Sequence, residues 1–355
     1  MSDVHMIRVT NDTRNAELLA ISWVLARRQR LRPVTPEPEW AKLDSTRICA
    51  EARRHRSVGL ILSAPDRGLL PSDALTTLAL IYRQSTLNAM AQAADLQRIL
   101  NRFEAARIPA LLAKGQAFSS LVYGDWAVRG VSADADLLIP PKQIGNAHRV
   151  MLGLGYHCDH DEGHRAPLAG WRGRYNRWLH HERSYMATNR LRVDVHWRPV
   201  PGSAPWTHFD ALWSERAELV LHGRTVQVPG PRTCLRLAAG QGEPDGWPTL
   251  RGACDVIAAE ILLPTDEVRR LRARDPLVAA ATTNAPQIIL RGNPNWSRTE
   301  PARKAGSWRR EWLLRARTDN VVRAAARSAL GNWLPARTFM PMDAEEVDHP
   351  ERLAT

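Results

Sequence analysis

The chain has 355 residues, of which 49 are Lys or Arg and 37 are Asp or Glu, giving a formal net charge of +12. Hydrophobic residues make up 44% and charged residues 24%, which is typical of a soluble globular protein. The start of the chain has no apolar signal core, and no apolar run approaches the roughly 20 residues that span a bilayer. Four scattered cysteines without a Cys-x-x-Cys spacing argue against a disulfide scaffold. We therefore expect a cytoplasmic protein without membrane segments, whose positive charge favours polyanionic or phosphorylated partners.

The first 106 residues are predicted to be a helical region. Apolar residues recur with helical spacing over residues 14–30, 40–57 and 71–106, and the Pro-rich stretch 33–38 indicates a linker. The third stretch is long enough for one long helix or two in series. No catalytic constellation is found in this region.

A short buried strand is predicted over residues 108–113, and it leads directly into Lys114-Gly115 and a helix over residues 116–123. The first N–H groups of a helix have no partner within the helix, and the helix dipole places positive charge there. A strand, a Gly turn and a helix start in this order are therefore typical of an anion-binding site.

Two carboxylates, Asp134 and Asp136, begin the next apolar run, Asp134-Ala-Asp136-Leu-Leu-Ile. In a strand, side chains two residues apart share a face, so the two carboxylates point together. Like charges held this way repel each other unless a cation lies between them or one of them is protonated. Two interpretations remain open for this pair alone: a metal-phosphate site, or a solvated strand end.

A hairpin is predicted from residues 178–187 and 191–199, and its second strand places Asp194 and His196 on one face. His196 is either a structural or a substrate-contacting residue. Trp197 is interpreted as a core residue, and His180-His181 as an exposed strand start. A second hairpin is predicted over residues 217–228.

The segment 231–335 is predicted to be a second helical region, followed by a flexible tail over 336–355. Asp255 is interpreted as a packing or hydrogen-bonded residue of this region. The expected elements are helices over 233–240, 249–263 and 265–274, a loop over 284–300, and a basic helix over 302–330.

Four segments resemble an uncharacterised nucleotidyltransferase family that belongs to the polymerase-β-like superfamily and often accompanies bacterial peptide natural-product clusters. They agree with it in order and spacing over about residues 70–265. The segments are Ile108-Pro-Ala-Leu-Leu-Ala-Lys114-Gly115 with Tyr123, Arg129 with Asp134-Ala-Asp136-Leu-Leu-Ile, Val193-Asp194-Val-His196-Trp197-Arg198, and Trp247-Pro-Thr-Leu-Arg-Gly-Ala-Cys-Asp255.

The resemblance implies an α+β fold with a nucleotidyltransferase-like mixed β-sheet core over residues 107–230, flanked by the two helical regions. It implies an enzyme that transfers a nucleoside monophosphate from an NTP to a hydroxyl or phosphate acceptor with Mg²⁺, or alternatively Mn²⁺, as cofactor. The expected acceptor is a peptide or small molecule in peptide natural-product tailoring or secondary metabolism.

The resemblance also implies roles for individual residues. Asp134, Asp136 and Asp194 would hold the metal, and Asp194 would take the proton of the acceptor hydroxyl. The remaining site residues would bind the nucleotide or its phosphates: Lys114, Gly115, Arg129 and His196.

One departure concerns the phosphate turn, where Lys114-Gly115-Gln116 stands in place of the superfamily's Gly-Ser pair. Two alternatives therefore remain open. The first is a catalytically silent protein of the same fold that binds a nucleotide or peptide. The second is a nucleotidyltransferase acting on tRNA, which the net charge favours although no nucleic-acid-binding motif is present.

Overall fold

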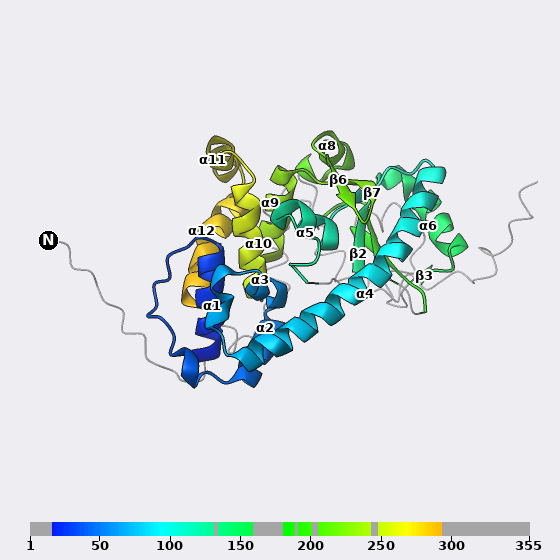
Figure 1. The fold of residues 1–355 in the computed structure, drawn as a ribbon. Helices are drawn as coiled ribbons and strands as arrows, with labels where there is room; N and C mark the ends of the chain where they lie inside the picture. Colours follow the sequence, from blue (N-terminus) through cyan, green and yellow to red (C-terminus); the bar gives the residue numbers. More distant parts are fainter. Residues whose placement is uncertain are drawn as a thin grey trace, which may run out of the picture.

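The structure is a computed structural model that describes residues 16–130, 134–158, 180–188, 191–200, 205–242 and 248–292. Figure 1 shows helices gathered at one end, strands at the other, and α4 running along both. The helices are α1 (Ala16–Arg28), α2 (Ser45–Arg54), α3 (Val58–Leu62), α4 (Ser72–Ala105), α5 (Gly115–Tyr123), α6 (Ile144–Gly153), α8 (Phe209–Ser214), α9 (Pro231–Gly242), α10 (Leu250–Ile261), α11 (Thr265–Arg274) and α12 (Pro276–Arg291). The strands are β1 (Leu111–Leu112), β2 (Asp134–Leu138), β3 (His157–Cys158), β4 (Glu182–Met186), β5 (Arg192–His196), β6 (Ala217–Leu221) and β7 (Arg224–Val228).

The two predicted helical regions pack against each other and share one hydrophobic core. Side chains from α1, α2 and α3 interleave there with side chains from α9, α10 and α12, and many of them are fully buried. Burying one such side chain stabilises the fold by about 1.5–3 kcal/mol. We call this unit the helical body. Its fully buried members include Ile21, Leu25, Ile48, Leu60, Leu235, Val256, Val278 and Ile289.

Helix α4 is one continuous helix of 34 residues, which decides between the two arrangements that the sequence left open. Its first turns bury Ala74 and Leu78 in the helical body. Its last turns bury Ile99 and Phe103 against the sheet. The helix therefore ties the two parts of the molecule together.

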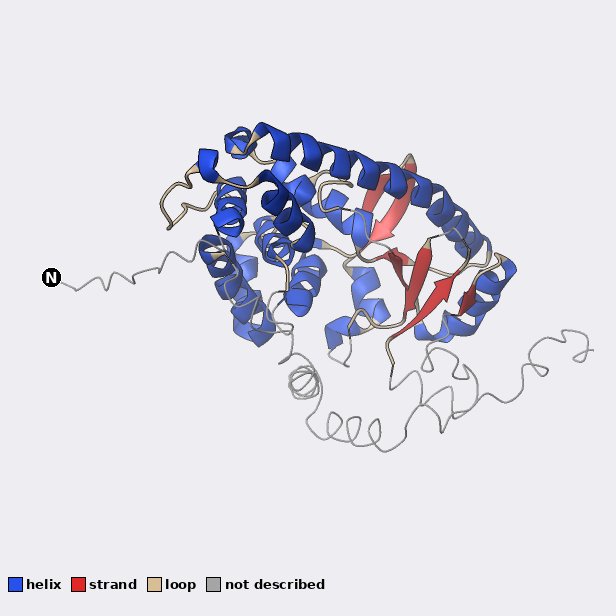
Figure 2. Cartoon of the chain, turned by 90° about the horizontal axis from the view of Figure 1, so that it is seen from below, coloured by secondary structure: helices blue, strands red, loops and turns tan. Residues whose placement is uncertain are grey.

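The main sheet has five strands in the order β1-β2-β5-β4-β3, in which β2 and β5 are parallel and the other neighbouring pairs are antiparallel. A mixed sheet was expected. Figure 2 shows it at the end of the molecule away from the N-terminal helices. One face is apolar and packs on α4 and α6 through residues such as Leu137, Val195 and Tyr185. The opposite face carries the polar residues of the candidate site.

The strands β6 and β7 form the predicted second hairpin. His222 and Gly223, at its turn, have φ values of 49° and 78°. Two successive positive φ values give a turn whose twist matches that of the flanking strands. The prediction is confirmed.

The predicted helix over residues 40–57 is confirmed for Ser45–Arg54 but is too long at both ends. A short 3₁₀ turn, Trp40–Lys42, precedes α2, and the side chain of Asp44 accepts hydrogen bonds from Thr46 N and Arg47 N. A carboxylate in this position caps a new helix start. Arg56 then has a left-handed φ of 50° and separates α2 from α3.

The predicted loop over residues 284–300 is also wrong for its first part, because α12 continues through Pro286 to Arg291. The side chain of Asp275 caps this helix, and Pro276 opens it. Val278, Ala281, Ala285 and Ile289 are spaced three or four residues apart and are fully buried. Burial of this face outweighs the local signal of an internal proline.

Several predictions lie outside the described residues: the basic helix over 302–330, the tail over 336–355, and Trp247. Within the described residues, no helix is long and apolar enough to cross a membrane.

Candidate functional site

Two parallel strands place the predicted carboxylates on one face of the sheet. Asp136 on β2 lies opposite Asp194 on β5, and Asp134 lies opposite Arg192. Asp136 and Asp194 are buried, at 6% and 7% exposed, while Asp134 is partly exposed. Arg192 extends along its own strand, and its Nε is 3.5 Å from Asp194 Oδ1.

The carboxylate of Asp136 is held by two donors. Lys114 Nζ lies 2.9 Å from Asp136 Oδ1, and His196 Nε2 lies 2.8 Å from the same oxygen. Burial alone would raise the pKa of Asp136, but the hydrogen bond from His196 and the charge of Lys114 hold this pKa well below its usual range. Asp136 is therefore an anion at neutral pH.

Lys114 stands at the predicted phosphate turn and remains a cation. Burial alone would lower its pKa, but Asp136, Glu182 and Asp134 raise it above the usual value. Its side chain is 22% exposed. The ammonium group can therefore reach a ligand that enters from solvent.

The turn itself has the geometry that the sequence predicted. Gly115 has a φ of +60°, in the left-handed region that favours glycine, and α5 begins at this residue. The side chain of its N-cap residue, Lys114, does not cap α5, and the helix itself supplies no acceptor for the N–H groups of its first turn.

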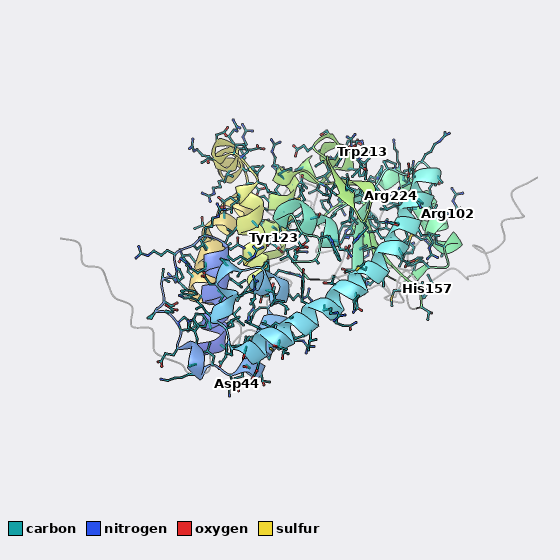
Figure 3. The ribbon with its side chains drawn as sticks, in the orientation of Figure 1. Asp44, Arg102, Tyr123, His157, Trp213 and Arg224 are labelled. Atoms are coloured by element: carbon teal, nitrogen blue, oxygen red, sulfur yellow. The ribbon has the colours of Figure 1, made fainter. Side chains whose placement is uncertain are left out.

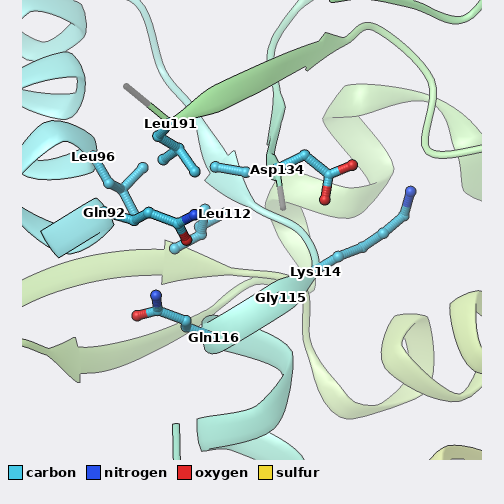
Figure 4. A pocket seen from close by; sticks show the side chains of 9 residues that line it. Gln92, Leu96, Leu112, Lys114, Gly115, Gln116, Asp134 and Leu191 are labelled. Carbon is cyan, nitrogen blue, oxygen red and sulfur yellow. The ribbon is translucent and has the colours of Figure 1, made fainter. Parts of the chain in front are cut away.

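A small, partly open pocket of about 20 Å³ lies against this turn. It is lined by Lys114, Gly115 and Asp134, by amide side chains of α4 and α5, and by apolar side chains of α4, β1, β2 and the residue before β5. Figure 4 shows Lys114 and Asp134 extending to the same side of the turn, with Gln92 and Gln116 on the opposite side. The pocket thus joins the Gly115 turn to one of the predicted carboxylates.

Arg129, which was predicted to contact phosphate, lies elsewhere. Its Nε donates to Asp255 Oδ2 at 2.8 Å, and Tyr123 Oη donates to Asp255 Oδ1 at 2.8 Å. Burial alone would lower the pKa of Arg129, but Asp255 raises it. Tyr123 is labelled in Figure 3, where α5 meets the helical body. The structure does not bring Arg129 to the pocket and confirms Asp255 as a hydrogen-bonded helix residue.

Two further residues join the site that sequence reasoning did not include. His196 Nδ1 lies 3.1 Å from Glu182 Oε2, and His181 Nε2 lies 3.3 Å from the same oxygen. His181 is only 26% exposed, so its interpretation as an exposed strand start is wrong. Burial and nearby cationic groups such as Lys114 hold the pKa of His181 well below its usual range.

Glu182 can be recognised as a site residue from strand pairing rather than from a sequence motif. The β4–β5 register places Glu182 opposite His196 and Ser184 opposite Asp194. Residues paired across neighbouring strands share a face, so Glu182 joins the polar face once this register is known. Trp197, by contrast, is 4% exposed and packs in the core of the sheet, as predicted.

Within the described ranges, one group of His, Cys, Asp or Glu side chains gathers its ligand atoms tightly enough for a metal ion. It consists of His181, Glu182 and His196, whose ligand atoms all lie within 4.8 Å of one another. The oxygens of the three predicted aspartates do not form such a group in these ranges.

Comparisons with known proteins agree with the character of this site. A family model described as an uncharacterised nucleotidyltransferase matches residues 41–265, which is more than half of the chain. A search of curated proteins finds no match. The matched range contains β1, the Gly115 turn, the aspartates of β2 and β5, and the Arg129–Asp255 pair. The chain belongs to this uncharacterised nucleotidyltransferase family.

Proposed function

We propose that this protein transfers a nucleoside monophosphate from an NTP to an acceptor at the polar face of the main sheet. One observation carries the proposal: Asp136 and Asp194 lie opposite each other on parallel strands, while Lys114, Gly115 and Asp134 line the adjoining pocket. Phosphoryl and nucleotidyl transfer depend on positioning and on charge neutralisation. Carboxylates beside an anion-binding turn supply both.

The residues present fit Mg²⁺. This ion prefers carboxylate oxygens and substrate phosphates, and it keeps several waters. Asp134, Asp136 and Asp194 offer carboxylates on one face, and Asp134 also lines the pocket. These residues would hold Mg²⁺, or Mn²⁺, which when bound supplies neutralisation of the triphosphate charge.

The chain's own residues have separate tasks in this proposal. The N–H groups at the start of α5 and the ammonium of Lys114 bind the phosphates. Lys114 exchanges its contact with Asp136 for the phosphate, since its side chain reaches solvent. His196 keeps Asp136 in place through its Nε2–H. Asp194 accepts the proton of the attacking hydroxyl.

The wider setting is part of the same proposal. The strand order, the Gly turn and the paired aspartates support placement in the polymerase-β-like superfamily. We infer an acceptor that is a peptide or small molecule of bacterial secondary metabolism, and a cytoplasmic location.

A second candidate is a catalytically silent binding protein, and the Asp136 contacts favour it. One oxygen of Asp136 already has two donors, Lys114 and His196. A site satisfied in this way can hold a nucleotide or peptide without reacting with it.

Labelled ATP, GTP, CTP and UTP, each titrated with and without Mg²⁺, test the proposal. We expect Mg²⁺-dependent binding of at least one NTP and release of pyrophosphate when an acceptor is supplied. The double variant Asp134→Ala/Asp136→Ala should lose both, whereas Asp210→Asn, on the exposed side of α8, should keep both. Binding without pyrophosphate release under any acceptor would favour the silent protein. No NTP binding at all would contradict nucleotidyl transfer and leave the silent protein only as a peptide-binding protein.

A further inference from the structure

The side chains of His181, Glu182 and His196 meet on the polar face beside Asp136. Glu182 Oε2 lies 3.1 Å from His196 Nδ1 and 3.3 Å from His181 Nε2. Two ligand atoms that are each about 2.0–2.1 Å from a tetrahedral zinc ion lie about 3.3–3.4 Å apart. The two distances to Glu182 are close to this value, and all three ligand atoms lie within 4.8 Å of one another.

His196 gives an independent indication of a ligand here. It is 1% exposed, and its Nδ1 makes no hydrogen bond. Its Nε2 faces the anionic carboxylate of Asp136 at 2.8 Å, and the tautomer with its proton on Nε2 donates to that carboxylate. Nδ1 then presents a lone pair next to a carboxylate oxygen of Glu182. Two acceptors that face each other in a buried place repel each other unless a cation joins them.

We propose that His181 Nε2, Glu182 and His196 Nδ1 form a site for a transition-metal ion of the Zn²⁺ class. Two imidazoles and one carboxylate suit such ions, whereas Mg²⁺ prefers oxygen ligands alone. Three protein ligands leave a fourth position open, which is the arrangement of zinc sites that bind a water or substrate.

Asp136 has a defined part in this site. Histidines that bind metals commonly donate their other N–H to a carboxylate, which fixes the ring and raises its basicity. The His196–Asp136 contact is of this kind. Asp136 would thus support the new site through His196, while its own oxygens belong to the carboxylate group of the proposed function.

Several groups of positive charge face His181. They are, in order of their effect, His196, Lys114, Arg198 and His180. Lys114 is paired with Asp136 at 2.9 Å, and Arg198 donates to the backbone oxygen of His180 at 2.6 Å. Glu182 therefore remains as an anionic ligand for the metal. The site does not depend on the proposed nucleotidyl transfer.

The test uses the full chain after metal removal with a chelator. Zn²⁺ is titrated in competition with a chromophoric chelator, and Co²⁺ is titrated separately while its visible absorption is recorded. We expect one ion per chain and a Co²⁺ spectrum typical of four-coordinate nitrogen and oxygen ligands.

The variants Glu182→Gln and His181→Gln each remove one ligand and should weaken Zn²⁺ binding about a hundredfold or more. Both side chains are partly exposed, at 30% and 26%, so we expect both variants to fold. The two variants then test the same metal site independently. His208→Gln replaces an exposed histidine before α8 and should bind as the parent does.

Two results would overturn the inference. If no stoichiometric Zn²⁺ or Co²⁺ binding occurs, the three side chains do not form a metal site. If binding occurs with the same affinity in Glu182→Gln and His208→Gln, the ion is held elsewhere.

Discussion

Two buried carboxylates, Asp136 and Asp255, have similar partners but different surroundings. Asp136 accepts from Lys114 and His196, and Asp255 accepts from Arg129 and Tyr123. The side chains of Arg129 and Asp255 are only 8% and 3% exposed. Lys114 is 22% exposed and lines a pocket. The Asp255 cluster is enclosed, and the Asp136 cluster is open to a ligand.

The two clusters make similar contacts but have different roles, one structural and one proposed to be functional. Asp255 lies on α10, Tyr123 ends α5, and Arg129 follows α5 along the chain. Their contacts hold the segment that leads to β2 against the helical body. The Asp136 contacts instead hold side chains ready beside the phosphate turn. In this protein, a buried ion pair therefore indicates a functional site only where one of its two side chains also lines a pocket.

The largest expected effect is on stability in the enclosed cluster. Arg129→Met leaves Asp255 buried without its cationic partner, and such a change costs about 3–5 kcal/mol. Urea unfolding should show this loss. The double variant Arg129→Met/Asp255→Leu, which removes both charges, should recover part of it. If Arg129→Met is as stable as the parent, the Arg129–Asp255 ion pair does not hold the segment before β2 against the helical body.

A buried histidine of the helical body, His55, should make the stability of the protein depend on pH. Burial, followed by the charge of Arg54, lowers the pKa of His55 to about 4, so the folded state keeps this ring neutral where the unfolded chain protonates it. Stability is complete above about pH 6.5 and is lost as the pH falls towards 4, by up to about 3 kcal/mol. Asp136 stays ionised over the same range.

Urea unfolding of the parent and His55→Gln between pH 7 and 4 checks this. The amide can still accept from Leu250 N, as His55 Nδ1 does at 3.3 Å, but it does not titrate. Burial also lowers the pKa of His148 to about 4, so the variant should lose only part of the slope. An unchanged slope in His55→Gln would contradict the assignment.

The smallest expected effect is in the open cluster. Lys114→Gln removes the phosphate-binding charge, so NTP affinity should fall about tenfold, which is about 1.4 kcal/mol. Stability should fall less than in Arg129→Met, because His196 still donates to Asp136. Equilibrium dialysis with labelled NTP and urea unfolding measure the two effects. A larger loss of stability than of affinity would place Lys114 with the enclosed cluster.

The parts of the site that depend on local pattern could be predicted from the sequence. Alternation within a strand placed Asp134 and Asp136 on one face, and the Gly115 turn followed from a strand, a glycine and a helix start. Glu182 and His181 could not be found in this way, because their proximity to His196 depends on the register between two strands.

Longer-range effects explain the other differences between sequence and structure. Arg129 and Asp255 are 126 residues apart, so no local pattern shows that Asp255 takes the charge of Arg129. The helix through Pro286 forms because its apolar face is buried against other helices, including α1 and α10. In each case a tertiary contact decided what local preference left open.

The most direct test compares Asp136→Asn with Asp255→Asn in one pair of measurements, Mg²⁺-dependent NTP binding and thermal unfolding. The account predicts that Asp136→Asn abolishes the Mg²⁺-dependent binding even at temperatures where the variant is fully folded. It predicts that Asp255→Asn lowers Tm and keeps the affinity of the folded protein. Parental NTP binding by Asp136→Asn would contradict the claim that this cluster is the substrate site.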